Sequence, residues 1–266
     1  MRCCFDTSEY TGTPDTGHCP AVIDVPNTVR ELDALYAAGR ESEAQSFLEE
    51  RRRLAAEGGD WRSEVSMISE LLGQYRRSMD RERGLAAADD ALSLIKEHRL
   101  GRTVSGATVL LNAATTLSCF GEHEDALAIF RHVSRVYSDN LDPGDYRFAG
   151  LYNNMANSFA ALGSTPEAEE MFRAAIALME KLPGGGNEIA VTLCSMAEMY
   201  DRLDPEDERI ALTLERAWET LCDPELKRDG YHAFMVSKCI PVFDRLGFFL
   251  YAAELKERAR RIYEGS

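Results

Sequence analysis

The sequence predicts an all-α fold made of about six helix-turn-helix units in a row. From Asn27 onward, apolar residues follow helical spacing almost without interruption, and no stretch shows the alternation of a strand. Turn residues break the pattern at regular distances, with 42 residues between Gly121 and Gly163. A fixed period of this size is typical of helical repeat proteins. We expect repeats at 27–57, 61–99, 105–138, 146–182, 187–222 and 230–264.

Residues 1–26 precede the periodic part and are rich in Thr, Pro, Gly and Asp. No helical spacing is sustained there, so we expect an irregular or flexible arm. The arm carries four metal-binding side chain types, Cys3, Cys4, His18 and Cys19. Their adjacent pairs lack the ligand spacing of ordinary zinc sites, and we predict no metal site. The sequence leaves open whether the arm is ordered or fills a groove of the repeats.

The turn inside each unit is marked by a residue at the same place. These anchors are Gly39, Met79, Gly121, Gly163 and Gly247, with Pro205 near the corresponding place in the fifth unit. Five residues later stands a small or apolar residue, namely Ala44, Gly84, Ala126, Ala168, Ile210 or Ala252. Seven residues further on is a second set, Arg51, Ala91, Val133, Ala175, Ala217 and Ala259. Small side chains let helices approach closely, so we expect helix contacts at these positions.

The first helix of each unit carries an apolar stripe at three- and four-residue spacing, which places the stripe on one helical face. Its members are Ile68, Leu71, Leu72 and Tyr75; Leu110, Ala113, Ala114 and Leu117; Tyr152, Met155, Ala156 and Phe159; Leu193, Met196, Ala197 and Tyr200; and Val236, Cys239, Ile240 and Phe243. We expect this stripe in the core. In the first unit Thr28 and Glu31 replace apolar residues, as is typical of a terminal repeat.

This order of residues resembles the tetratricopeptide repeat. The family pattern W-x2-L-G-x2-Y followed by A-x3-F is echoed by Tyr152, Met155, Ala156, Phe159, Ala168, Phe172 and Ala175. The usual repeat has 34 residues, and eight more lengthen the helices by about two turns in total. With Asn153-Asn154 and Glu167-Ala168-Glu169, this longer form is similar to the repeats of kinesin light chains and their prokaryotic relatives. The resemblance covers about 27–266 and implies a right-handed α-solenoid.

In that family the first helices line a concave groove, and two rows of residues would point into it here. The first row is Arg30, Glu70, Asn112, Asn154, Ser195 and Lys238. The second row, three residues later, is Asp33, Gly73, Thr115, Asn157, Glu198 and Pro241. We expect the peptide-binding residues to be Arg30, Glu70, Asn112, Thr115, Asn154, Asn157, Ser195, Glu198 and Lys238.

The resemblance implies that Asn112, Asn154 and Asn157 hold the backbone of a bound peptide, because an amide can donate and accept at once. The same asparagines could instead hydrogen-bond within or between repeats. Candidate contacts for acidic ligands are Arg30, Arg76, Arg77 and Lys238. The central groove lacks the Lys and Arg set with which chaperone-binding members hold a terminal carboxylate, so a chaperone ligand is not expected.

The turn of the last repeat reads Phe248-Phe249-Leu250-Tyr251, where the third and fourth repeats are polar. No polar capping helix follows in this sequence. Contiguous exposed apolar surface marks interfaces, so we expect a homodimer interface at Phe248, Phe249, Tyr251, Leu255 and Ile262. In the alternative interpretations this cluster packs under the preceding repeat, or the arm covers it.

Composition and motifs argue against other classes of function. The formal net charge of −15 argues against non-specific binding to nucleic acid or an anionic membrane. No apolar run reaches the length of a membrane span, no signal core follows Met1, and unpaired cysteines in helical apolar patterns suit the cytoplasm. The glycine-rich segment 182–187 lacks the Lys-Ser/Thr of a phosphate loop, and the histidines are scattered. We predict no enzyme and no cofactor.

The sequence therefore predicts a non-catalytic adaptor or scaffold that binds a peptide segment of a partner protein in the concave groove. Two alternatives stay open. One is a regulator that senses a signalling peptide in the same groove, and the other is a structural homo-oligomer whose groove is filled by its own arm. No residue identifies the partner or the pathway.

Overall fold

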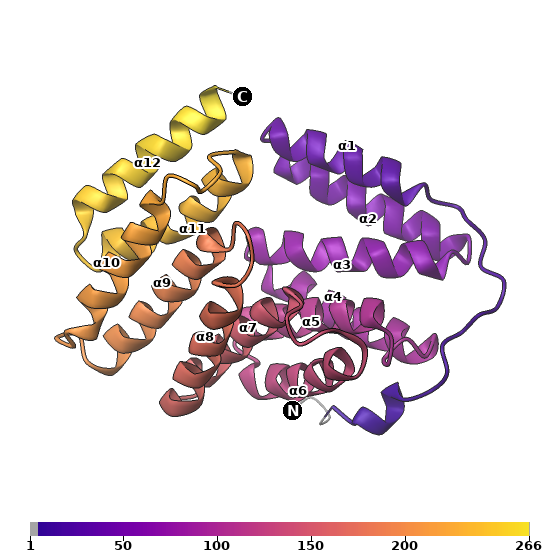
Figure 1. Ribbon diagram of the computed structural model, residues 1–266. Helices are drawn as coiled ribbons and strands as arrows, with labels where there is room; N and C mark the ends of the chain where they lie inside the picture. Colours follow the sequence, from indigo (N-terminus) through magenta and orange to yellow (C-terminus); the bar gives the residue numbers. More distant parts are fainter. Residues whose placement is uncertain (1–4, 266) are drawn as a thin grey trace. The chain divides into compact units, whose positions relative to one another are not determined.

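The computed structural model describes residues 5–265, and all regular elements in that range are helices (Figure 1). A short 3-10 helix, η1 (Thr7–Tyr10), precedes the α-helices. These are α1 (Val25–Ala37), α2 (Glu41–Glu57), α3 (Trp61–Arg77), α4 (Arg81–Glu97), α5 (Val104–Cys119), α6 (His123–Asn140), α7 (Arg147–Ala161), α8 (Thr165–Met179), α9 (Gly186–Leu203), α10 (Arg209–Cys222), α11 (Gly230–Arg245) and α12 (Phe249–Glu264). The all-α helical-repeat fold predicted from the sequence is confirmed. Cys3 and Cys4 lie outside the described residues.

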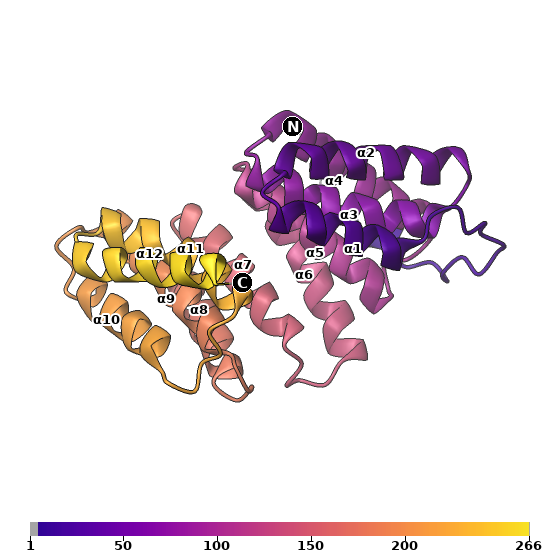
Figure 2. The same ribbon diagram turned by 90° about the horizontal axis from the view of Figure 1, so that it is seen from above.

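The chain forms two compact units, Met1–Asp142 and Pro143–Ser266. Unit 1 contains the helix pairs α1/α2, α3/α4 and α5/α6, and unit 2 contains α7/α8, α9/α10 and α11/α12. Within each unit the two helices of a pair pack together, and first helices of successive pairs also touch, as α3 does with α5 and α9 with α11. Figures 1 and 2 show the pairs of each unit following one another in chain order. Each unit is therefore a short helical-repeat stack.

Side-chain caps fix the starts of five of the described α-helices. Each of these caps is a side-chain oxygen that accepts a hydrogen bond from a backbone N–H of the first turn. The capping residues are Asp24 of α1, Asp60 of α3, Asp80 of α4, Thr103 of α5 and Asp229 of α11. The cap at Asp24 begins α1 at Val25, two residues before the expected start of the repeats.

The turn anchors adopt the backbone conformation that their sequence predicts. Gly39, Gly121, Gly163 and Gly247 have φ angles between 68° and 90°, in the left-handed region that glycine adopts without strain. Met79 also lies there, at φ 52°, although it carries a side chain. In the fifth repeat α9 runs to Leu203 and does not end in a residue with a left-handed φ, so Pro205 lies only near the place of the anchor.

The small residues after the anchors are buried contacts between helices. Ala44, Ala126, Ala168 and Ala252 have no exposed surface. At Gly84 an added Cβ would stand 2.4 Å from Cε2 of Phe120, so only glycine fits there. The apolar stripe of the first helices is also mostly buried, with Ile68, Leu110 and Val236 at 0% exposure. Thr28, a departure in the first repeat, is buried and donates its hydroxyl to the carbonyl of Asp24.

Hydrogen bonds between successive pairs join residues about one repeat apart. Asn112 Nδ2 donates to Ser69 Oγ over 2.9 Å, and Arg76 Nη1 donates to Thr116 Oγ1 over 2.8 Å. In unit 2 the Tyr231 hydroxyl donates to Glu188. These separations of 40 to 43 residues fit a repeat of about 42.

The described part of the arm packs on unit 1. The rings of Phe5 and Tyr10 stack 4.5 Å apart and both face His132 of α6. Glu9 pairs with Lys96 of α4 over 2.8 Å. The buried carboxylate of Asp60 accepts from the backbone N–H groups of Val22 and Ile23, over 2.8 and 3.0 Å. The arm therefore contacts α4, α6 and Asp60, the residue that caps α3. None of these contacts uses a residue of the two predicted groove rows.

Within residues 5–265, none of the helices has both the length and the apolar character that crossing a bilayer requires.

Candidate functional site

The first helices of unit 1, which are α1, α3 and α5, expose polar residues at equivalent positions. We call this surface the first-helix face of unit 1. Its residues are Arg30, Asp33, Glu70, Gly73, Arg76, Arg77, Asn112 and Thr115, all of them exposed or half-buried. The apolar stripes of the same helices are buried on the opposite side. The residues predicted from the sequence therefore lie at the surface, and their contacts decide which groups face a ligand.

Asn112 joins two helices. Its Nδ2 group donates to Ser69 of α3, and its backbone carbonyl accepts from Arg76 over 3.1 Å. The amide nitrogen is thus engaged inside the fold, as the alternative interpretation of these asparagines expects. Thr115 likewise donates its hydroxyl to the carbonyl of Leu111, one turn earlier in α5. Arg30 donates to Asn27 Oδ1 over 3.0 Å within α1.

Gln74 is the centre of a hydrogen-bond network between α1 and α3. Its side chain is 2% exposed, and its Oε1 accepts from the Tyr36 hydroxyl and from Arg77 Nη2, each over 2.9 Å. Its Nε2 donates to the carbonyl of Glu41 over 3.3 Å. The Arg77 guanidinium also lies over the Tyr36 ring, 4.6 Å from the centroid. Gln74 was not among the residues predicted from the sequence, although a polar residue next to the apolar stripe is a usable signal.

Glu70 lies one helical turn before Gly73 on α3. Desolvation by the surrounding protein raises the pKa of its carboxyl above the usual value, and the negative charge of Asp33 adds to the rise. Arg77 and Arg76 act in the opposite direction. The face of unit 1 thus places acidic and basic groups close together on α3.

The first helices of unit 2, α7, α9 and α11, form the first-helix face of unit 2. Its residues are Gly150, Asn154, Asn157, Val191, Ser195, Glu198, Phe234, Lys238 and Pro241. Asn157 Nδ2 donates to the carbonyl of Asn153 over 2.9 Å, which fixes the orientation of its amide. Near Gly150 no atom lies within 4 Å of the place where a Cβ would stand, so the surface is open there.

Charged groups of this face are tied to neighbouring helices. Arg245 of α11 donates to Glu198 and to Asp201 of α9, each over 2.7 Å. The Lys238 ammonium lies 4.3 Å from the centre of the Phe234 ring, which is 41% exposed. The face of unit 2 therefore combines amides, a hydroxyl, an ion pair and an exposed aromatic ring.

The C-terminal aromatic cluster is divided between the core and the surface. Leu255 has no exposed surface, and Tyr251 stacks on Trp218 with ring centroids 4.3 Å apart. Phe248 packs edge-on against Phe243, which is buried. Phe249 and Leu250 are 64% and 86% exposed. Ile262 is half-buried. The cluster thus folds partly under its own repeat, and an interface there would use Phe249 and Leu250.

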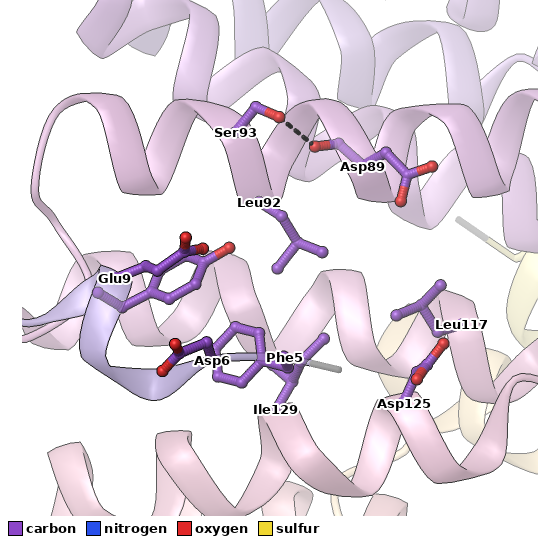
Figure 3. A pocket seen from close by; sticks show the side chains of 10 residues that line it. Phe5, Asp6, Glu9, Asp89, Leu92, Ser93, Leu117, Asp125 and Ile129 are labelled. Carbon is purple, nitrogen blue, oxygen red and sulfur yellow. Dashed lines mark hydrogen bonds between the residues drawn. The ribbon is translucent and has the colours of Figure 1, made fainter. Parts of the chain in front are cut away.

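A cavity of about 280 Å³ lies in unit 1 where the arm meets α4 and α6 (Figure 3). Phe5, Leu92 and Ile129 line it, and acidic residues stand around it. Asp6 accepts from the N–H of Ser8, Glu9 pairs with Lys96, and Asp89 and Asp125 also interact within the chain. The cavity is thus a gap between the arm and the helices on which the arm packs.

No group of three or more metal-binding side chains occurs among residues 5–265. Cys19 is half-buried, with its sulfur 3.6 Å from Asp60 Oδ1.

The comparisons with known proteins agree with this geometry. The family model described as tetratricopeptide repeat matches residues 147–213, which span α7 to α9 and the start of α10. Residues 147–213 are similar to tetratricopeptide repeats. The resemblance predicted from the sequence is confirmed, although the family match covers this segment alone. No curated protein matches the chain.

Solved structures share the fold. BtubC (BKLC) from P. vanneervenii is 18% identical with a TM-score of 0.51, over 86% of this chain and 91% of that chain. A Podosopora anserina putative kinesin light chain with nearly identical TPR-like repeats is 14% identical with a TM-score of 0.51, over 74% of this chain and 94% of that chain. A variant of that kinesin light chain has a TM-score of 0.52 at 14% identity, over 74% of this chain and 93% of that chain. At these identities the likeness is one of fold.

Proposed function

We propose that this tetratricopeptide-repeat chain is a non-catalytic adaptor, and that the first-helix faces bind an extended segment of a partner protein. The tetratricopeptide repeat fold supports a role in protein-protein interaction. A cytoplasmic location belongs to the same proposal and is supported by the free state of the five cysteines among the described residues.

One observation carries the proposal. The first helices keep polar side chains at the surface in register, while hydrogen bonds to adjacent helices hold the neighbouring groups in place, as Gln74 holds Tyr36 and Arg77. A surface whose side chains are already ordered loses little conformational entropy when it binds a ligand. Many small contacts to such a surface suffice to hold an extended chain.

In unit 2 the contacts would follow from the local chemistry. Asn157 uses its Nδ2 group within α7, and its Oδ1 would accept from a backbone N–H of the bound segment. Asn154 and Ser195 stand at equivalent positions of α7 and α9, and Phe234 offers an apolar surface beside Lys238. Amides would hold the backbone, and the aromatic and charged groups would select side chains.

The test is capture of partner proteins from a native lysate by the wild-type chain and by an Asn154→Ala plus Asn157→Ala variant. We expect the variant to lose at least one partner that the wild-type chain retains. The matched control is Glu167→Ala plus Glu170→Ala, which alters two exposed residues of the second helix α8 and leaves the face intact. Identical partner sets for all three proteins, with equal thermal stability, would contradict the proposed binding surface.

A second function is favoured by the exposure of Phe249 and Leu250 at the start of α12. Two large apolar side chains in contact with water are stabilised by pairing with a second copy. Light scattering over a concentration series should then show a dimer that Phe249→Ser plus Leu250→Ser converts to a monomer. A wild-type mass that stays monomeric at every concentration would exclude this function.

A further inference from the structure

A cluster of arginines in unit 2 lines a cavity of about 440 Å³. Arg228 belongs to the loop between α10 and α11, and Arg258 and Arg261 lie on α12, the second helix of the last pair. Glu254 and Ile262 of α12 also line it. Three arginines and one glutamate leave two positive charges in excess, although the whole chain has a formal net charge of −15. The cavity is therefore a local positive site on an acidic protein, and its lining residues lie outside the first-helix faces.

The fold fixes Arg258 against the end of α10. Its Nη1 group donates to the carbonyl of Leu221 over 2.6 Å. Its Nη2 group lies 3.1 Å from Glu254 Oε1 and 3.7 Å from Cys222 Sγ. The guanidinium also lies 5.5 Å from the centre of the Trp218 ring. Because the side chain is only 17% exposed, these contacts set its position at the cavity.

A buried histidine and the preceding loop fix Arg228. Its Nη2 group donates to the carbonyl of Asp223 over 3.2 Å, and its Nη1 group lies 3.3 Å from His232 Nε2. Since a guanidinium has donors only, Nε2 is the acceptor, and the ring proton lies on Nδ1. Nδ1 in turn lies 2.8 Å from Asn187 Oδ1. Neutral His232, which has no exposed surface, thus positions Arg228 at the cavity.

Arg228 and Arg258 are two like charges that act on each other. Desolvation and the charge of Arg258 lower the pKa of Arg228. Asp223 and Glu254 act in the opposite direction. Among residues 5–265 Arg228 forms no ion pair, and Arg258 pairs with Glu254, whose side chain is 59% exposed. Exposed pairs of this kind stabilise weakly, so positive charge is left at the cavity that a bound anion would offset.

Arg261 supplies a third guanidinium group. It follows Arg258 by three residues, a spacing that places both side chains on one side of α12. Its Nε group donates to Glu257 over 2.9 Å, and the side chain is 73% exposed. Within the described part of the chain its two Nη groups make no hydrogen bond. They are therefore available to a ligand in the cavity.

We propose that this cavity binds a phosphate group, to which Arg228, Arg258 and Arg261 donate. Each guanidinium has five N–H donors, and the contacts within the chain leave some of them unused on all three side chains. The excess of two positive charges matches a phosphate monoester, which carries about −1.5 to −2 at pH 7. A carboxylate has one charge and two oxygens, so it suits three guanidinium groups less well.

This inference goes beyond the proposed function and does not depend on it, because the site uses α12 and the loop between α10 and α11. The phosphate group is either free in solution or carried by a phosphorylated serine of a partner protein. Both sources present the same tetrahedral anion, and the probes below distinguish them.

The experiment uses the full chain as receptor at about pH 7.5, where phosphate is mostly a dianion. The probes are inorganic phosphate, the phosphopeptide Ac-Ala-pSer-Ala-NH2 and the carboxylate peptide Ac-Ala-Glu-Ala-NH2. Binding is followed through the NMR signals of arginine Nε–Hε groups. We expect one or both phosphate probes, but not the carboxylate peptide, to shift the signals of Arg228 and Arg258, and the responding probe identifies the source. No shift at these residues, or equal shifts with all three probes, would overturn the proposal.

Arg228→Gln and Arg261→Gln each remove one donor of the cavity. We expect either change to weaken binding of the responding phosphate probe by about tenfold, as the loss of a charge-assisted hydrogen bond predicts. Arg260→Gln is the matched control, because Arg260 is an exposed arginine of α12 that also pairs with Glu257 but does not line the cavity. Equal binding by Arg261→Gln and Arg260→Gln would contradict the proposed site.

Glu254→Gln tests the charge of the cavity in the opposite direction. It removes the one carboxylate among the described lining residues and keeps a side chain of the same shape. Because the bound anion is then no longer repelled by this group, we expect tighter binding of the phosphate probe. Weaker binding by Glu254→Gln would count against an electrostatic site.

Discussion

Units 1 and 2 differ in the residue five positions before the turn anchor of a first helix, which is buried and polar in α3 and α5 of unit 1 and buried and apolar in α9 and α11 of unit 2. Unit 2 keeps the buried Ser158 at this position of α7, and a buried hydrogen bond between His232 and Asn187 joins α11 to α9 elsewhere. Five residues before the anchors of α3 and α5 stand Gln74 and Thr116, which are 2% and 0% exposed and bind across to the adjacent first helix. The corresponding residues of α9 and α11 are Met199 and Val242.

The turns of the two units also differ in backbone conformation. Among residues 5–265 both non-glycine residues with a left-handed φ, Met79 and Arg99, belong to unit 1, and the left-handed residues of unit 2 are glycines. Unit 1 therefore carries backbone strain at its turns that unit 2 avoids.

The largest expected effect is the pH dependence of unit 2. His232 is fully buried, its Nδ1 lies 2.8 Å from Asn187 Oδ1, and burial together with the charges of Arg228 and Arg258 lowers its pKa to about 4. In the unfolded chain the pKa is about 6.5. The unfolded state therefore binds the proton first, so the stabilisation is complete above pH 6.5 and is lost as pH falls toward 4, by about 3 kcal/mol.

Each unit has one of the two tryptophans, Trp61 or Trp218, so denaturation of a Trp61→Phe protein followed by fluorescence reports on unit 2. His232→Gln keeps a neutral polar group and removes the titration. The stability difference between the parent and His232→Gln should shrink between pH 7 and pH 4. A difference that stays constant over this range would show that His232 does not cause the pH dependence.

The second prediction concerns the buried link of unit 1. Gln74→Ala leaves the Tyr36 hydroxyl and Arg77 without their shared acceptor, and we expect a loss of about 1–3 kcal/mol. The measurement is denaturation of a Trp218→Phe protein followed by the fluorescence of Trp61, which reports on unit 1. Met199→Leu is the control in unit 2, since a swap of similar volume costs less than about 1.5 kcal/mol. Equal losses in the two variants would mean that the buried amide contributes nothing beyond its volume.

The sequence predicted features that depend on local geometry. A left-handed φ at Gly39 or Gly163 and a small residue at Ala126 or Ala168 follow from the period, because each repeat needs one tight turn and one close helix contact. The surface position of the two polar rows was predictable for the same reason, since helical spacing fixes which residues share a face.

Contacts between distant residues were not predictable. For Asn112 the sequence left open a bound peptide or a hydrogen bond between repeats, and its amide nitrogen binds Ser69, which depends on the side chain that the preceding first helix presents. The docking of Phe5 and Tyr10 on His132 joins residues more than a hundred positions apart and leaves no periodic signal. The division into compact units after Asp142 falls at Pro143-Gly144, a pair typical of a break between helices.

The third prediction tests the strained turn of unit 1. Met79 is 66% exposed and holds a left-handed φ of 52°, so Met79→Gly removes strain without removing a buried contact. We expect a gain of about 0.5–1 kcal/mol in the stability of unit 1, offset in part by the greater freedom of glycine in the unfolded chain. The converse change in unit 2, Gly163→Ala, should destabilise by a similar amount. Melting curves of both variants that fall on the same side of the parent would contradict this account of the turns.

The smallest effect is expected from the ion pairs of unit 2. Arg245 binds Glu198 and Asp201 but is half-exposed, and exposed pairs contribute only about 0.2–1 kcal/mol. Arg245→Met should therefore cost less than about 1 kcal/mol at low salt and nothing measurable at about 1 M salt, where the Debye length is about 3 Å. The loss from Gln74→Ala should not change with salt, because that link carries no ion pair. If both losses respond to salt alike, the distinction between the buried amide of Gln74 and the exposed ion pairs of Arg245 fails.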